Sequence, residues 1–256
     1  MTVLIPRAPE ALRARRTDHP GFGLRPMPLA REGGRLPDAD PGAGSAEDPI
    51  RFSVCRSPER LAEILQLRRL AFAAPRPSDP SSTVAYEHDP RDEDASVVIA
   101  ESAGRIIGSV RLCRPIPGPI LHHTSRISGS TRGLPVRADY IETSRACIHP
   151  DHRGKGLFWH LVAHMLHAAR AFGRPYLVAG TGSRHWRNWR RCGFTKIGAT
   201  YRRAHSEAEY SVLVLELRRA LEPRGIAPEL ARALAPLLDS EARATAGHDL
   251  SVSGAP

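Results

Sequence analysis

The sequence has few cysteines, almost no lysine and no long apolar run. Its four cysteines are far apart and form no Cys-x-x-Cys pair, which argues against a zinc ribbon or a disulfide scaffold and favours a reducing compartment. No apolar stretch approaches the roughly 18 residues of a membrane span. The opening segment Met1–Pro6 is broken by proline too soon for a signal peptide. We therefore expect a soluble protein of the cytoplasm, without a membrane span.

The charge of the chain is unbalanced and is carried by arginine. The 256 residues have a formal net charge of +10, with Lys155 and Lys196 as the only lysines. Such an excess favours a polyanionic partner, namely nucleic acid, an anionic membrane or an acidic carrier protein. Arginine suits bidentate contacts with phosphate and carboxylate groups. A compositional bias of the genome would produce the same excess, so charge alone leaves the partner open.

The chain divides into three segments of different composition. Residues 1–48 are rich in Pro, Gly, Arg and Asp without sustained periodicity, so we expect a disordered arm. Residues 49–218 alternate strand and helix patterns around a hairpin at 95–113, which predicts one α/β (α+β) domain with a mixed, mostly antiparallel sheet flanked by helices. Residues 114–138 should be irregular. Residues 219–256 should hold a C-terminal helix and a frayed tail.

The most informative stretch runs from Glu142 to Phe158. It begins as a strand that carries a carboxylate and the guanidinium of Arg145, and it continues into a glycine-punctuated turn at 153–156 and the start of a helix. Such a turn directs unpaired backbone N–H groups and the positive end of the helix dipole at one place. That place suits a pyrophosphate. The alternative interpretation of the two glycines is an ordinary tight turn.

This order of elements resembles the GNAT acyltransferase superfamily over residues 50–218. The Arg-Gly-Lys-Gly turn at 153–156 lies between a strand and a helix, and a second strand and Gly193-Phe194 follow at the spacing of the superfamily. The resemblance implies a GNAT-like fold whose turn binds the pyrophosphate of acyl-coenzyme A (acyl-CoA) or the phosphopantetheine of an acyl carrier protein. It assigns the donor contacts to Ile148, Arg153, Gly154, Lys155, Gly156 and Leu157.

Two positions depart from the superfamily pattern. The sixth position of the turn, usually Gly or Ala, is Phe158. Trp189 stands where many members carry a tyrosine that acts as general acid. An indole cannot donate a proton in that role, so we expect that this site does not protonate a leaving thiolate in the usual way.

Charged motifs upstream of the turn carry a narrower resemblance. Their order and spacing are similar to those of acyl-homoserine lactone (autoinducer) synthases and of the related N-acyl amino acid synthases and exosortase-associated acyltransferases. The tryptophan that a lactone synthase carries between the first two motifs is absent, so we favour the N-acyl amino acid synthase branch, which is a group of long-chain N-acyltransferases. The motifs are Arg68-x-x-x-Phe72, Glu87-x-Asp89-x-x-Asp92, Arg111-Leu112 and Glu142-x-x-Arg145.

Amide formation from a thioester and an amine assigns a role to Glu142. The amine must lose a proton, the thioester must be held close, and the oxyanion must meet hydrogen-bond donors. A carboxylate on the strand beside the donor site is the candidate base, acting directly or through water. The alternative is a structural ion pair of Glu142 with Arg145 or Arg111, and we count Arg145 with Glu142 among the candidate catalytic residues.

Of the other motif residues, Asp89 and Asp92 are also candidate catalytic residues, and Arg68, Phe72 and Arg111 are candidates for substrate binding. Asp89 and Asp92, in a polar loop, would position the ammonium group of the acceptor or lock the loop through an arginine. Arg68 and Arg111, with Phe72 beside them, would bind an acceptor carboxylate bidentately, or the two arginines would neutralise the acids. The sequence leaves these alternatives open.

Two further groups favour a structural or docking role over a separate site. His160, His164 and His167 lie at helical spacing, but the apolar residues define the other half of that helix, so the histidines should face outward and no metal is predicted. A basic, aromatic helix near 184–192 suits an acidic carrier-protein helix or a CoA phosphate better than nucleic acid.

The sequence therefore predicts an N-acyltransferase. It would move an acyl group, expected to be a fatty acyl, from acyl carrier protein or acyl-CoA to the amine of a small acceptor, expected to be an amino acid or a derivative. An acetyl-CoA-dependent N-acetyltransferase and a non-catalytic GNAT-like binding module are the alternatives.

Overall fold

The computed structural model describes residues 49–56, 58–72, 90–115, 127–202, 209–222 and 225–252. Its strands form one eight-stranded sheet in the order β1-β2-β3-β5-β6-β8-β7-β4. All neighbouring strands are antiparallel except β5 and β6, which run parallel. The predicted mixed, mostly antiparallel sheet is confirmed, whereas the arm predicted for residues 1–48 lies outside the described residues.

The expected strands and helices are present, with two additions. One is β4, which lies in the segment that we expected to be irregular, and the other is the short helix α4. The strands are β1 (Arg51–Cys55), β2 (Ser96–Ser102), β3 (Arg105–Cys113), β4 (Ile127–Gly129), β5 (Tyr140–Ile148), β6 (Tyr176–Gly182), β7 (Thr195–Arg202) and β8 (Glu209–Glu216). The helices are α1 (Pro58–Phe72), α2 (Leu157–Arg170), α3 (Trp186–Arg191), α4 (Leu217–Leu221) and α5 (Pro228–Val252).

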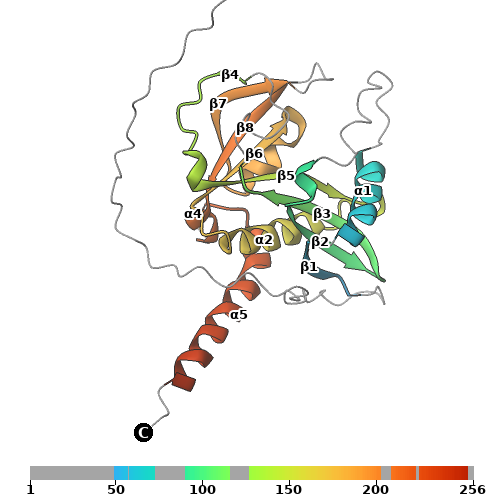
Figure 1. The fold of residues 1–256 in the computed structure, drawn as a ribbon, viewed down its shortest axis with the longest axis vertical. Helices are drawn as coiled ribbons and strands as arrows, with labels where there is room; N and C mark the ends of the chain where they lie inside the picture. The colour runs from blue at the N-terminus through green and yellow to red at the C-terminus, as the bar shows by residue number, and fades with distance from the viewer. Residues whose placement is uncertain are drawn as a thin grey trace, which may run out of the picture.

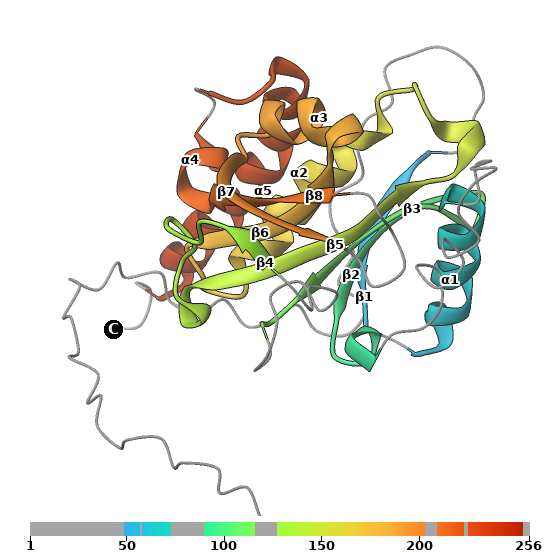
Figure 2. The ribbon, with the colours of Figure 1, turned by 90° about the horizontal axis from the view of Figure 1, so that it is seen from above.

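Helices cover both faces of the sheet (Figures 1 and 2). Helices α2, α4 and α5 lie together on one face, and α1 lies on the opposite face. The face under α2 is closed by the largest apolar cluster of the described residues, which includes Val98, Leu112, Ile141, Leu161, Met165, Leu177, Leu213 and Leu215. Apolar side chains close that face, whereas the buried arginines Arg68 and Arg111 lie on the opposite face, under α1.

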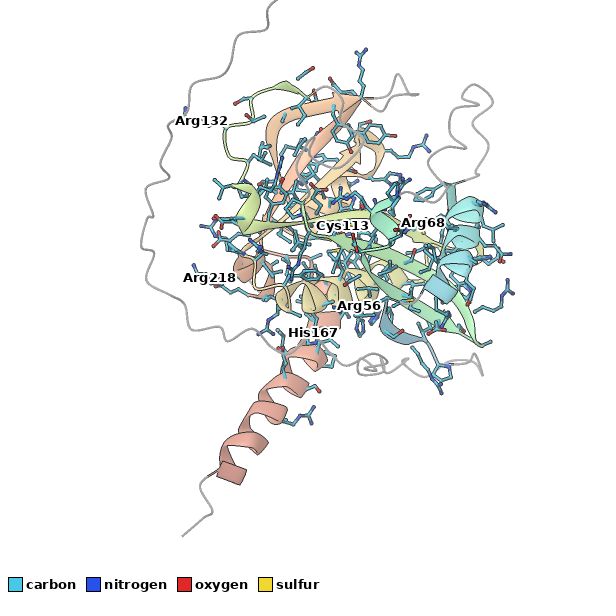
Figure 3. The ribbon with its side chains drawn as sticks, viewed as in Figure 1. Arg56, Arg68, Cys113, Arg132, His167 and Arg218 are labelled. Atoms are coloured by element: carbon cyan, nitrogen blue, oxygen red, sulfur yellow. The ribbon has the colours of Figure 1, made fainter. Side chains whose placement is uncertain are left out.

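Helix α1 carries a charged residue into the interior. The helix has proline at its first position, where the missing N–H has no cost. Ile64, Leu67 and Ala71 recur at helical spacing and are buried against β3 and β5. Arg68 lies on the same side of the helix and is 0% exposed. Figure 3 shows Arg68 between α1 and the sheet. The buried stripe of α1 therefore delivers a guanidinium to the sheet surface.

Strands β5 and β6 are paired over only part of their length. They form four parallel pairs that end at Thr143 opposite Ala179. Beyond this point β5 continues to Ile148 along β3, and β6 continues to Gly182 along β8. Among the described strands, none pairs with the β5 edge that faces β6 from residue 144 onward. After β5 the chain passes through the short 3-10 turn Pro150–His152 and the glycine turn at 153–156 before α2 begins at Leu157.

The expectation that the histidines of α2 face outward is wrong. His164 is 2% exposed, and its ring stacks on Phe52 of β1 with centroids 4.1 Å apart and planes at 9°. His160 and His167 are half-buried. Helix α5 packs along α2, and β1 extends the sheet beneath it, so elements distant in sequence cover the polar side of α2. Burial lowers the pKa of His164 to about 3.

Candidate functional site

The glycine turn has the backbone geometry of an anion-binding loop. Gly154 and Gly156 have φ of 76° and 83°, the left-handed region that favours glycine. Gly156 is the N-cap of α2, so the first backbone N–H groups of that helix point outward beside it. A Cβ placed on either glycine would meet no atom within 4 Å. The exposed backbone leaves room for an anion, and the pyrophosphate site stays a prediction.

Arg153 contacts α1 from within this turn. One guanidinium nitrogen donates to the carbonyl of Ala71, near the end of α1, and Nε donates to the carbonyl of Ile148 at 3.3 Å. A cation at a helix C-terminus complements the helix dipole and satisfies a terminal carbonyl. Arg153 therefore joins the turn to α1. Of the other predicted donor residues, Lys155 is exposed, Ile148 is half-buried and Leu157 is buried in the core.

Glu142 forms a buried ion pair with a residue that the motif analysis did not select. Its Oε2 accepts from Nη1 of Arg91 at 2.5 Å, and side-chain exposures of the pair are 3% and 6%. Arg91 also donates to the carbonyl of Arg114 at 3.2 Å. The predicted alternative, a pair of Glu142 with Arg145 or Arg111, named the right kind of interaction and the wrong arginine. Among the described residues, none donates to the second carboxylate oxygen, Oε1.

Asp92 connects α1 to the sheet through two buried arginines. Nη1 of Arg68 lies 3.0 Å from both carboxylate oxygens, and Nη2 lies 3.0 Å from Oδ1. Arg111 of β3 donates to the same Oδ1 at 2.9 Å and, through Nε, to Ser144 of β5 at 3.1 Å. The structure thus favours the interpretation in which Asp92 is neutralised by arginine. This Arg68–Asp92–Arg111 triad holds the short 3-10 turn Pro90–Asp92, and with it Arg91, against β5.

The remaining predicted residues are placed as follows. Asp89 and Glu87 lie outside the described residues. Phe72 is half-buried at the end of α1. Arg145 sits in a β-bulge of β5, where the register with β3 shifts, and its φ is 57°. A non-glycine residue in the left-handed region is strained and is often found at functional sites. The bulge lies at the stretch of β5 that has left β6.

Phe158 and Trp189, the two departures from the superfamily pattern, contact each other. Their rings meet edge to face with centroids 5.9 Å apart, and Trp189 makes a similar contact with Phe194 at 5.1 Å. Trp189 is 9% exposed and belongs to the core on the α2 side. The large side chain at the sixth position of the turn is therefore accommodated by packing against α3, and Trp189 has a structural role.

The described residues contain neither a metal-binding cluster nor a disulfide. No set of three His, Cys, Asp or Glu side chains within them is arranged to hold a metal ion. The four cysteines are buried and unpaired with one another. None of the helices described is long and apolar enough to cross a membrane.

Comparison with known proteins identifies the fold and the family. MesI, a CoA-dependent acyl-homoserine lactone synthase, superposes with a TM-score of 0.50 at 18% identity over 72% of this chain and 95% of its own. FeeM, an N-acyl amino acid synthase from uncultured soil microbes, gives 0.49 at 14% identity over 67% and 93% of the two chains. A GNAT-family putative acetyltransferase from Desulfovibrio desulfuricans gives 0.48 at 14% identity over 66% and 99%. No curated protein sequence matches.

The likeness to MesI concerns the fold alone, and the sheet order is that of a GNAT-like α/β fold. Family membership rests on the sequence itself. A family model described as "N-acyl amino acid synthase FeeM" matches residues 63–217, which include most of α1, the Arg68–Asp92–Arg111 triad, β5 and the glycine turn. The chain therefore belongs to the FeeM family of N-acyl amino acid synthases, which are GNAT-type N-acyltransferases.

Proposed function

We propose that this protein transfers a fatty acyl group from a phosphopantetheine thioester to the amine of an amino acid, with Glu142 as the base. One observation carries the proposal. Glu142 is a buried carboxylate with one oxygen held by Arg91 and the other without a described donor, beside the point where β5 leaves β6. A fixed carboxylate with one available oxygen can accept the proton of an attacking amine.

The ion pair with Arg91 supports a functional role for Glu142. Burying two charges has a large desolvation cost, and an apolar pair of similar size is often at least as stable. The Arg68–Asp92–Arg111 triad adds three more buried charged groups next to it. Clusters of buried, interacting charged groups are typical of active sites. The contact with Arg91 thus fixes one carboxylate oxygen of Glu142, close to the point where β5 and β6 stop pairing.

Mass spectrometry of lipid extracts from cells that overexpress the protein tests this function. We expect N-acyl amino acids that are absent from the empty-vector control and from cells that express Glu142→Gln. The glutamine keeps the shape and one acceptor for Arg91, so this variant should remain folded, which a thermal melt checks. Absence of new species with the wild-type protein, or equal amounts with the variant, contradicts the proposal. Acetylated products alone would favour the short-chain N-acetyltransferase.

A basic surface beside the glycine turn supports an acyl carrier protein as the donor. Arg184, Arg187 and Arg190 of the α3 segment are exposed. Arg191 lies over the ring of Trp159, 4.7 Å from its centroid, which joins this surface to the first turn of α2. Between Asp151 and Glu207 the sequence contains no acidic residue. A genome-wide arginine bias would not remove acids from this one region, so the surface fits an acidic protein that presents its pantetheine to the turn.

Charge reversal on α3 tests the donor. With acyl carrier protein as donor, Arg187→Glu should raise KM at least about tenfold, because it places a like charge against an acidic partner. The matched control is Arg218→Glu on α4, whose side chain is 71% exposed and lies away from the turn. With acyl-CoA the Arg187 variant should behave as the wild type does. The carrier-protein surface is refuted if the variant and the wild type have the same KM for each donor. It is also refuted if the KM of the variant rises only with acyl-CoA. A gel shift with duplex DNA that Arg187→Glu abolishes would assign the surface to nucleic acid instead.

A further inference from the structure

Tyr201 of β7 places its phenol against the backbone of β6. The side chain is 4% exposed, and its ring stacks on Tyr210 of β8 with centroids 5.4 Å apart. A Cβ on Gly180 would lie 2.7 Å from Cζ of Tyr201 and closer still to its hydroxyl oxygen. Gly180 has no positive φ, so its backbone does not demand glycine. The absence of a side chain at Gly180 is therefore what admits the hydroxyl group of Tyr201.

Gly180 lies where β5 and β6 have just separated. It is the first residue of β6 after Ala179, whose pairing with Thr143 is the last between the two strands. It is also two residues beyond Val178, the partner of Glu142. Side chains two residues apart lie on the same face of a sheet, so the phenol over Gly180 and the carboxylate of Glu142 share a face.

Strand geometry gives the distance between the Cα atoms of Gly180 and Glu142. Two residues along a strand span roughly 6.6 Å and neighbouring strands lie about 4.8 Å apart, so the Cα of Gly180 is about 8 Å from that of Glu142. The open edge of β5 and the bulge at Arg145 come directly after Glu142 along the same strand, and the glycine turn follows that strand. A thioester whose phosphate end rests on the glycine turn and whose acyl carbon lies near Glu142 would have its sulfur between these elements.

We propose that Tyr201 is the catalytic proton donor to the leaving thiolate, an inference that rests on the proposed N-acyl transfer. The amine nitrogen, deprotonated by Glu142, forms the C–N bond to the thioester carbonyl carbon. As the C–S bond breaks, the electron pair goes to sulfur and the phenolic proton of Tyr201 passes to it. Solvent then reprotonates the phenolate. The products are the amide and a free thiol, and Trp189 does not take part because its indole has no acidic proton to give.

Substitution of the hydroxyl group alone tests the role. Tyr201→Phe keeps the ring and its stack on Tyr210, so it should fold and bind CoA with a Kd within about twofold of the wild type in calorimetry. With dodecanoyl-CoA and an equimolar mixture of the proteinogenic amino acids, its kcat should fall at least about 100-fold, the low end of general acid catalysis. The matched control is Tyr210→Phe, which should stay within about twofold of the wild type.

A donor with a better leaving group separates chemistry from packing. Thiophenyl dodecanethioate releases a far more acidic thiol that needs no proton, so Tyr201→Phe should recover most of the wild-type rate on it. An equal loss on both donors would show that the hydroxyl group only supports the fold, and no loss on either would show that it has no role. Either result contradicts the role of Tyr201 as proton donor. The proposed N-acyl transfer still stands in both cases, because the wild-type protein turns over. A wild-type protein that acylates no amine with either donor overturns both.

Discussion

Replacing Asp92 by alanine is the perturbation whose effect follows most directly from the structure. Asp92 accepts three of the short contacts described above from Arg68 and one from Arg111, and the side chains of all three residues are at most 1% exposed. Removal of the carboxylate leaves two guanidinium groups buried without their counter-ion. Removal of Arg68 instead leaves Asp92 paired with Arg111. The two losses are therefore unequal.

Breaking a buried ion pair from one side typically costs about 3–5 kcal/mol, because the remaining charge is uncompensated. We expect Asp92→Ala to fall in that range, a large part of the 5–15 kcal/mol that stabilises a typical domain. Arg68→Met should cost at least about 1 kcal/mol less, since one charge pair survives. Asp92→Asn, which keeps an acceptor oxygen, should lie between the two and provides a folded variant if the alanine variant is unfolded.

Urea unfolding followed by tryptophan fluorescence measures these differences. The matched control is Glu101→Ala, which removes a partner of Arg60 in a pair of 2.7 Å whose side chains are 30% and 22% exposed. A solvated pair contributes about 1 kcal/mol or less. The reasoning is refuted if Asp92→Ala and Glu101→Ala lower the free energy of unfolding by similar amounts, or if Arg68→Met costs more than Asp92→Ala.

Three further predictions concern the turn, α1 and α2. Gly156→Ala, which places a Cβ at φ 83°, should lower the free energy of unfolding by about 1–2 kcal/mol and weaken CoA binding in calorimetry; an unchanged Kd would mean that the turn does not hold the donor. Arg153→Gln should speed hydrogen exchange in the last turn of α1, since it removes the donor to Ala71, whereas exchange at α5 should not change; unaltered α1 rates would contradict the capping role. His164 has a lowered pKa, so the unfolded chain binds more protons below about pH 6.5 and stability falls as pH falls toward 3. Between pH 7 and pH 5, the free energy of unfolding measured in urea should therefore fall by about 2 kcal/mol less for His164→Phe than for the wild type. Parallel pH curves for the two proteins would contradict this.

The parts of the site that follow one local pattern could be predicted from the sequence. The glycine turn is visible because left-handed backbone requires glycine and because the strand before it and the helix after it have clear periodicities. The helical spacing of Ile64, Leu67 and Ala71 in α1 is likewise a local pattern, and Arg68 lies beside these residues. Strand β5 contains Glu142 and Arg145, which the sequence placed on a strand before the turn. In each case the neighbours in sequence determine the geometry.

The parts that depend on contacts between distant segments could not. The ion pair of Arg91 with Glu142 joins residues that are distant in sequence, so no local pattern indicates it. Only the tight turn that begins at Pro90 buries Arg91 together with Asp92. The histidine side of α2 was assigned to solvent because nothing local shows that β1 and α5 cover it. The contact of Tyr201 with Gly180 crosses β8 and leaves no periodic signal, apart from a strand glycine that no turn explains.

The central claim is that the protein forms an amide between a carrier-bound acyl group and an amino acid. Its most direct test combines the purified protein, dodecanoyl-acyl carrier protein and an isotopically labelled amino acid mixture, with free thiol and lipid product measured together. We expect one labelled N-dodecanoyl amino acid to form for each thiol released. With Glu142→Gln, neither the thiol nor the labelled amide should form faster than in the uncatalysed reaction. Thiol release without a labelled amide, or a labelled amide formed equally by the variant, would contradict it.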